Sequence, residues 1–195
     1  MALARFRSNN SGFSLMEVVV SMGLLSAVSL GVAQLFAVSS KANLVARGYT
    51  STTAMAEQKM EQLRSLTWGF DLLEQGLPLS DTTSNLSYTP PQQNGSGLNP
   101  SPTNALDQNV SGYFDYLDAT GGYVGTGTTA PTTAVYVRRW SIQPLPTNPN
   151  NTIILQVLVT PVVNERARQA ESSSPARTRL PGDSLLTTVK TRKAS

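Results

Sequence analysis

The stretch Gly12-Phe13-Ser14-Leu15-Met16-Glu17 opens a long apolar run and decides how the chain is interpreted. From Val18 to Val38 there are 21 residues without a formal charge. A helix rises about 1.5 Å per residue, so this run would be about 31 Å long, the thickness of a bilayer's hydrocarbon core. The first proline is Pro78, so nothing interrupts the run. We therefore expect one long N-terminal helix whose first half can span a membrane.

Three interpretations compete for this N-terminal segment. The first is a secretory signal that is removed after the apolar run, with Gly31-Val32-Ala33 as a small-x-small cleavage site. The run is longer than a usual signal core, however, and Glu17 stands at its start. The second is a transmembrane anchor that is never cleaved. The third is a leader of residues 1–12, polar and basic, that is removed ahead of the apolar run.

The third interpretation draws on a resemblance. Gly12-Phe13-x-Leu15-x-Glu17, between a basic leader and a charge-free helix, resembles the processing and methylation motif of type IV pilins and type II secretion pseudopilins. The resemblance implies that a prepilin peptidase cleaves between Gly12 and Phe13, and that Phe13 is then N-methylated. It also implies a single-pass anchor in the bacterial inner membrane, with a cytoplasmic N-terminus, before the subunit enters a pilus at the cell surface.

The chemistry of these residue types supports the same roles. Gly12 has no side chain, so a protease can approach its backbone closely. Glu17 is a carboxylate at the edge of an apolar span, where ionised groups are costly and usually partnered. For assembly, its natural partner is the new amine of Phe13 on a neighbouring subunit. The alternative is that Glu17 lies among lipid headgroups or complements the positive end of its own helix.

Small residues recur along the apolar helix. Gly23, Ala27 and Gly31 are spaced by four, which lets the backbones of neighbouring helices approach closely. The alternative is that glycine and alanine are simply common in membrane helices. Most major type IV pilins have a proline in this helix, and this chain has none there. That difference favours a minor pilin that primes assembly or lies near the tip.

Residues 41–68 are expected to form the soluble half of the same helix, ending near Trp68-Gly69. Apolar residues at helical spacing predict a stripe on which a sheet packs: Ala56, Met60 and Leu63. The charged residues between them are assigned to the polar face: Glu57, Lys59, Glu61 and Arg64. Residues 54–64 also resemble the corresponding part of PilV-type minor pilins and of I-type minor pseudopilins.

Residues 69–134 are rich in turn signals and are expected to form a variable loop region with short strands. Asp115 and Asp118 lie in an aromatic and acidic stretch within it. They lack the spacing of an EF-hand calcium loop, so we expect solvated aspartates rather than a metal site or an acid–base pair. No metal and no cofactor are expected anywhere in the chain.

Two strands are predicted in residues 135–163, Val135 to Gln143 and Thr152 to Val163, forming an antiparallel hairpin whose apolar face covers the helix stripe. Arg138 and Arg139 are expected on the strand surface. Residues 164–184 look like a flexible connector. Leu185 to Thr191 forms either a last strand or an exposed tail. The predicted fold class is α+β, with the long helix packed on a small antiparallel sheet.

Composition excludes several functions. The chain has no cysteine and no histidine, so disulfides, thiolate or imidazole metal sites, and Cys–His or Ser–His nucleophiles are absent. An enzyme is therefore not expected. Residues 69–134 contain six acids and no Lys or Arg, whereas residues 164–195 contain seven basic residues and three acids. The basic end has no aromatic residue to stack on bases, so nucleic-acid binding is not favoured.

The expected segments are a leader (1–12), an assembly helix (13–40), a soluble helix (41–68), a loop region (69–134), a hairpin (135–163) and a basic connector with its tail (164–195). Together they predict a minor type IV pilin, whose partners are other pilin subunits, the prepilin peptidase and the pilus assembly machinery. One alternative is a minor pseudopilin of type II secretion. Another is a membrane-anchored adhesin or DNA-binding module.

Overall fold

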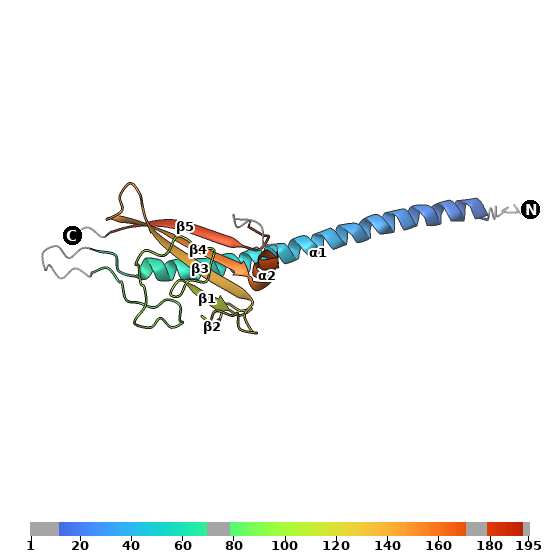
Figure 1. Ribbon diagram of the computed structural model, residues 1–195. Helices are drawn as coiled ribbons and strands as arrows, with labels where there is room; N and C mark the ends of the chain where they lie inside the picture. The colour runs from blue at the N-terminus through green and yellow to red at the C-terminus, as the bar shows by residue number, and fades with distance from the viewer. Residues whose placement is uncertain (1–11, 70–78, 171–178, 193–195) are drawn as a thin grey trace, which may run out of the picture. The chain divides into compact units, whose positions relative to one another are not determined.

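The structure, a computed structural model, describes residues 12–69, 79–170 and 179–192 of the 195-residue chain. Its contacts divide the chain into two units, Met1–Leu44 and Val45–Ser195. In chain order, the elements are α1 Leu15–Ser65, β1 Phe114–Leu117, β2 Tyr123–Gly125, β3 Tyr136–Pro144, β4 Thr152–Pro161, α2 Val162–Ala170 and β5 Ser184–Thr191 (Figure 1).

The long N-terminal helix is confirmed. Helix α1 is a continuous α-helix of 51 residues, and no proline interrupts it. At the start of the helix, the carbonyl of Ser14 accepts hydrogen bonds from the backbone N–H groups of Glu17, at 3.0 Å, and Val18, at 3.2 Å. The helix ends at Ser65, slightly before the expected Trp68-Gly69.

The predicted hairpin is also confirmed, within a larger sheet. Five antiparallel strands lie in the order β2-β1-β3-β4-β5. Strands β3 and β4 pair from Tyr136 opposite Pro161 to Pro144 opposite Ile153. Strand β5 pairs with β4 along its whole length, so Ser184–Thr191 forms a last strand rather than an exposed tail.

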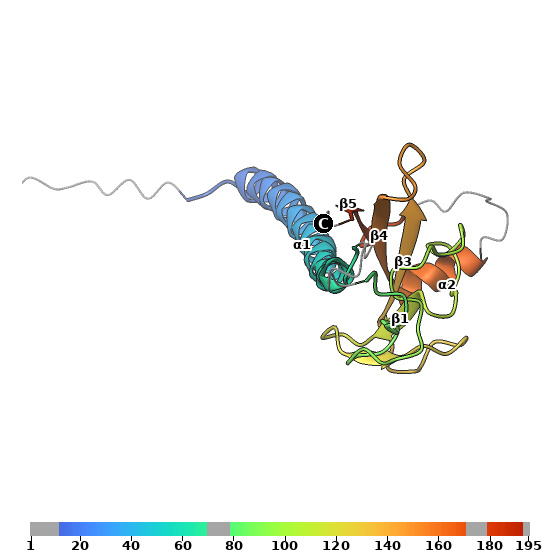
Figure 2. The same ribbon diagram turned by 90° about the vertical axis from the view of Figure 1, so that its left-hand side faces the viewer.

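The main hydrophobic core lies between α1 and one face of the sheet. The predicted stripe of Ala56, Met60 and Leu63 is buried there together with Met55. From the sheet come alternate residues of the two central strands: Trp140, Ile142, Ile153, Leu155, Val157 and Val159. Figure 2 shows the sheet between this part of α1 and helix α2. The fold is α+β, with a long helix on a small antiparallel sheet, as the sequence predicts.

The predicted flexible connector is wrong over its first part. Helix α2 occupies Val162–Ala170 on the other face of the sheet, where a smaller apolar cluster contains Phe114, Tyr116 and Val137. The α2 segment is rich in helix-forming residues, and its Glu165 and Arg168 form an i,i+3 ion pair at 3.6 Å. The part of the connector at 171–178 lies outside the described residues.

Candidate functional site

The first candidate site is the beginning of α1. Gly12 and Phe13 precede the helix, and Phe13 is 83% exposed. A Cβ atom added to Gly12 would meet no atom within 4 Å, so nothing in the described chain obstructs its backbone. The remainder of the predicted leader, including Arg5 and Arg7, lies outside the described residues.

Glu17 stands in the first turn of α1. Phe13, Glu17 and Ser21 line the same shallow, mostly apolar depression of about 310 Å³, together with Val18, Met22 and Leu25. Among the described residues, the Glu17 carboxylate has no side-chain hydrogen bond and no ion pair. The structure therefore brings Phe13 and Glu17 together on one surface and leaves the carboxylate open to an external donor.

The apolar part of α1 is exposed along its whole length. Large side chains such as Leu24, Leu30 and Phe36 are 65–70% exposed. By length and composition, α1 is apolar enough to cross a membrane, and none of its most apolar window is buried by the rest of the chain. An apolar surface of this size is stable only against lipid or other apolar surfaces, which is consistent with anchoring in an inner membrane.

The small residues of α1 have no packing role within the described chain. A Cβ atom added to Gly23 or Gly31 would meet no atom within 4 Å, and Ala27 lies between them on an exposed stretch. Their small size is therefore not required by any contact that the structure describes. Their predicted role in packing between helices stays a prediction.

The second notable group is a buried charge cluster of Lys59, Asp115 and Arg138. All three side chains are at most 1% exposed. The guanidinium of Arg138 donates to both oxygens of Asp115, at 2.9 and 2.8 Å. The Lys59 ammonium lies 3.0 Å from Asp115 Oδ2. The assignments of Lys59 to the polar face, of Arg138 to the strand surface and of Asp115 to solvent are therefore wrong.

This cluster joins α1 to the sheet. Besides Asp115, Lys59 donates to the carbonyl of Leu86 at 2.7 Å and lies 4.3 Å from the ring centre of Trp140. Arg138 also donates to the carbonyl of Met55 on α1 at 3.1 Å. Burial lowers the pKa of Lys59 from 10.5 to about 8, a shift that Asp115 opposes and Arg138 adds to. The hydrogen-bond donors of Lys59 and Arg138 are thus used by partners within the chain, so the cluster has a structural role.

Asp118 does not join Asp115. Its Oδ1 atom accepts the Thr120 hydroxyl at 2.7 Å and the backbone N–H groups of Thr120 and Gly122, both at 2.8 Å. These hydrogen bonds, first that of the Thr120 hydroxyl, lower the pKa of Asp118. The side chain therefore fixes the turn between β1 and β2. In the described parts of the chain, no group of three carboxylates is placed to hold a metal ion.

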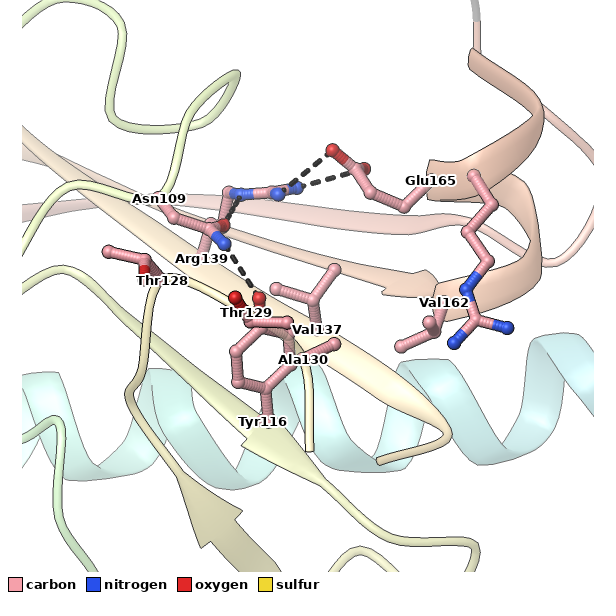
Figure 3. Close-up of a pocket in the computed structure, with 10 residues that line it drawn as sticks. Asn109, Tyr116, Thr128, Thr129, Ala130, Val137, Arg139, Val162 and Glu165 are labelled. Carbon is pink, nitrogen blue, oxygen red and sulfur yellow. Dashed lines mark hydrogen bonds and ion pairs between the residues drawn. The ribbon is translucent and has the colours of Figure 1, made fainter. Parts of the chain in front are cut away.

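On the opposite face of the sheet, Arg139 is buried as well, which corrects its expected place on the strand surface. It is 2% exposed and forms two hydrogen bonds to Glu165 of α2, at 3.2 and 3.0 Å. Its Nε donates to Asn109 at 2.9 Å, and Asn109 in turn donates to the Tyr116 hydroxyl at 2.8 Å. Figure 3 shows this network in the wall of a pocket. The sequence analysis did not identify Asn109, Tyr116 or Glu165.

Comparison with known protein families supports the first site. Residues 7–33 match the family described as the prokaryotic N-terminal methylation motif. No curated protein and no solved structure matches the chain. The matched stretch contains Gly12, Phe13 and Glu17 together with the small residues up to Gly31. The motif implies a structural subunit of the type IV pilin or pseudopilin class, which assembles with other such subunits after cleavage by a prepilin peptidase.

Proposed function

We propose that this chain is a minor type IV pilin. It is a non-enzymatic filament subunit, held in the inner membrane with its body outside the cytoplasm until assembly. The observation that carries the proposal is the open Glu17 carboxylate beside Phe13 at the start of an exposed apolar helix, within a methylation motif. Cleavage after Gly12 creates an amine on Phe13, and the Glu17 of a neighbouring subunit binds it.

The energetics favour this pairing. A carboxylate at the edge of the hydrocarbon layer is costly without a partner, and within the described residues Glu17 has none. An ammonium from a neighbouring subunit would supply the opposite charge as the helix leaves the lipid. The free space at Gly23 and Gly31 would allow a neighbouring α1 to approach closely, because small residues reduce the distance between helix backbones.

The helix without proline supports a minor rather than a major subunit. Helix α1 is continuous from Leu15 to Ser65, so it offers no break of the kind that a proline produces. A subunit of this kind is suited to priming the filament or to a position near its tip. Its partners are the other pilins, the prepilin peptidase and the inner-membrane assembly machinery.

The decisive experiment is intact-mass and N-terminal analysis of the chain extracted from membranes, with and without the prepilin peptidase. We expect a mature chain that starts at N-methylated Phe13 only when the peptidase is present. A chain that starts at Met1, or after Ala33, would contradict the proposal and leave an anchored or secreted binding protein. Copurification with pilus subunits, rather than with a secretion pseudopilus, then tests the minor-pilin role.

A further inference from the structure

The pocket on the α2 face of the sheet has the features of a binding site for a small ligand. It measures about 270 Å³, slightly below the usual range of about 300–1,000 Å³ for drug-sized ligands. Its walls come from the loop before β1, from β1, from the loop before β3, from β3 and from α2. Every one of these belongs to the Val45–Ser195 unit, so the pocket contains no residue of the apolar first part of α1, and the inference does not rest on the function proposed above.

The polar wall of this pocket is held in place before any ligand arrives. Glu165 and Asn109 fix the Arg139 guanidinium, which is 2% exposed. Asn109 also donates to the hydroxyl of Tyr116, which leaves the phenolic proton free to be donated into the pocket. Burial raises the pKa of Tyr116, so the phenol remains a donor at neutral pH. Ligand binding would therefore cost little ordering of this wall.

Packing alone does not require this network. A buried ion pair is often no more stabilising than apolar residues of similar volume. The same face of the sheet already has an apolar cluster around Phe114 and Val137. Apolar side chains of this kind would be enough for α2 to pack on the sheet without charged residues. Instead, three polar side chains from β1, β3 and α2 converge on one cavity: Tyr116, Arg139 and Glu165. Convergent polar groups with an apolar floor are typical of ligand sites.

The lining indicates the chemistry of the ligand. Val137 and Val162, which are 1% and 6% exposed, form the apolar floor of the pocket. Exposed Thr128 and Thr129 place hydroxyl groups along one side, where they can donate to or accept from ligand hydroxyls. Arg139 and Glu165 neutralise each other, whereas the exposed Arg166 lines the pocket. The pocket therefore carries one net positive charge.

We propose that this pocket binds a single sugar acid of the hexuronic type. The carboxylate of the sugar would pair with Arg166, and its hydroxyls would bond to Tyr116, Thr128 and Thr129. Its ring would lie over the pocket floor, beneath which Val137 and Val162 are packed. The pairing of one carboxylate with one guanidinium supplies charge-assisted hydrogen bonds, and the hydroxyls distinguish the ligand from a simple carboxylic acid.

The test is calorimetric titration of the full-length chain in detergent with D-galacturonate, D-galactose and acetate. We expect saturable binding of galacturonate with a dissociation constant of about 1 mM. Galactose should bind at least about tenfold more weakly, because it lacks the charge, and acetate should give no saturable signal. Absence of galacturonate binding, or equal binding of acetate, would overturn the proposal.

Two variants locate the binding in this pocket. Arg166→Gln, at an exposed position, should weaken galacturonate binding about tenfold and leave galactose unchanged. Tyr116→Phe should weaken both sugars about three- to tenfold, because it removes only the hydroxyl. The matched control is Arg47→Gln, an exposed arginine on α1 that does not line the pocket, and it should bind as the wild type does. If Tyr116→Phe fails to fold, Arg166→Gln decides, and an unchanged affinity in Arg166→Gln would overturn the proposal.

Discussion

Asp115 and Glu17 are both carboxylates next to apolar surfaces, and they differ in whether a described residue pairs with them. Asp115 is fully buried, and Lys59 and Arg138 satisfy it from two different elements. Glu17 stands in the first turn of an exposed apolar helix, and no described residue pairs with it. Among the described residues, Asp115 is therefore paired within its own unit, whereas Glu17 is not paired. We expect the partner of Glu17 to be the Phe13 amine of a neighbouring subunit.

The largest effect is expected at Gly12. A Gly12→Val substitution should abolish processing and filament incorporation, because a branched side chain would keep the peptidase from the backbone. Mass analysis of the membrane-extracted chain would show an unprocessed N-terminus. Gly127→Val is the matched control, because a Cβ atom there would meet only an ordinary contact at 3.5 Å. Normal processing of the Gly12 variant would contradict the predicted cleavage position.

Glu17→Gln tests whether the unpaired carboxylate of α1 is needed for assembly. The variant should be processed normally, but its incorporation into filaments should fall by more than about tenfold, because removing one partner of a desolvated charge pair costs about 2–5 kcal/mol. Immunoblots of membranes and sheared filaments would measure the two amounts. Glu61→Gln removes an exposed carboxylate from the same helix and should leave incorporation intact. Wild-type incorporation of the Glu17 variant would mean that the carboxylate needs no partner.

Asp115→Asn tests how much the buried, paired carboxylate contributes to stability. It leaves two cations buried without their anion, so the free energy of unfolding of the body should fall by about 3–5 kcal/mol. Urea denaturation followed by fluorescence of the buried Trp140 would measure this loss. The matched control is Glu57→Gln on the exposed face of α1, for which no measurable change is expected. Equal stability of both variants would show that Asp115 does not hold the body together.

The smallest effect is a pH dependence that arises from Lys59. Its pKa of about 8 in the folded chain lies below the 10.5 of the free side chain, so the unfolded chain binds more protons between these two pH values. The free energy of unfolding should therefore rise with pH across this window, by up to about 1.4 kcal/mol per pH unit.

The measurement is the difference in unfolding free energy between the wild type and Lys59→Met, from about pH 8 to about pH 10.5. Subtraction removes the contribution of groups common to both proteins, such as Lys190. The facing charges, Asp115 and Arg138, remain in both. A difference that is flat with pH would mean that Lys59 titrates as an ordinary exposed lysine.

The sequence allowed much of the fold to be predicted, because periodicity is a local property. The α1 stripe and the alternation in β3 and β4 placed Ala56, Trp140 and Leu155 correctly in the core. The same periodicity also contained the signal that was missed. Lys59 follows Ala56 by three residues and precedes Leu63 by four, on the buried stripe. Arg138 alternates with Trp140 and Ile142 on the face that meets α1.

What could not be predicted is the partnership between these charges. Asp115 lies opposite Arg138 only through the register between β1 and β3, and it meets Lys59 only because α1 packs on that face. A single charged residue in a sequence resembles a surface residue unless its distant partner is known. Helix α2 could not be predicted for a different reason, because its polar composition is equally typical of a connector. At the N-terminus, by contrast, the motif is contiguous, so it could be recognised from the sequence, and the roles of Gly12, Phe13 and Glu17 stay predictions.

Strand β5 has a consequence for the end of α1. Lys190 of β5 donates to the carbonyls of Arg64 and Leu66, and Arg192 donates to the carbonyl of Gly69 at 3.2 Å. Carbonyls at the end of a helix have no partner within the helix. The end of α1 is thus held by a side chain that lies 126 residues after Arg64 and 124 residues after Leu66 in the sequence. A change in β5 would therefore also weaken the end of α1.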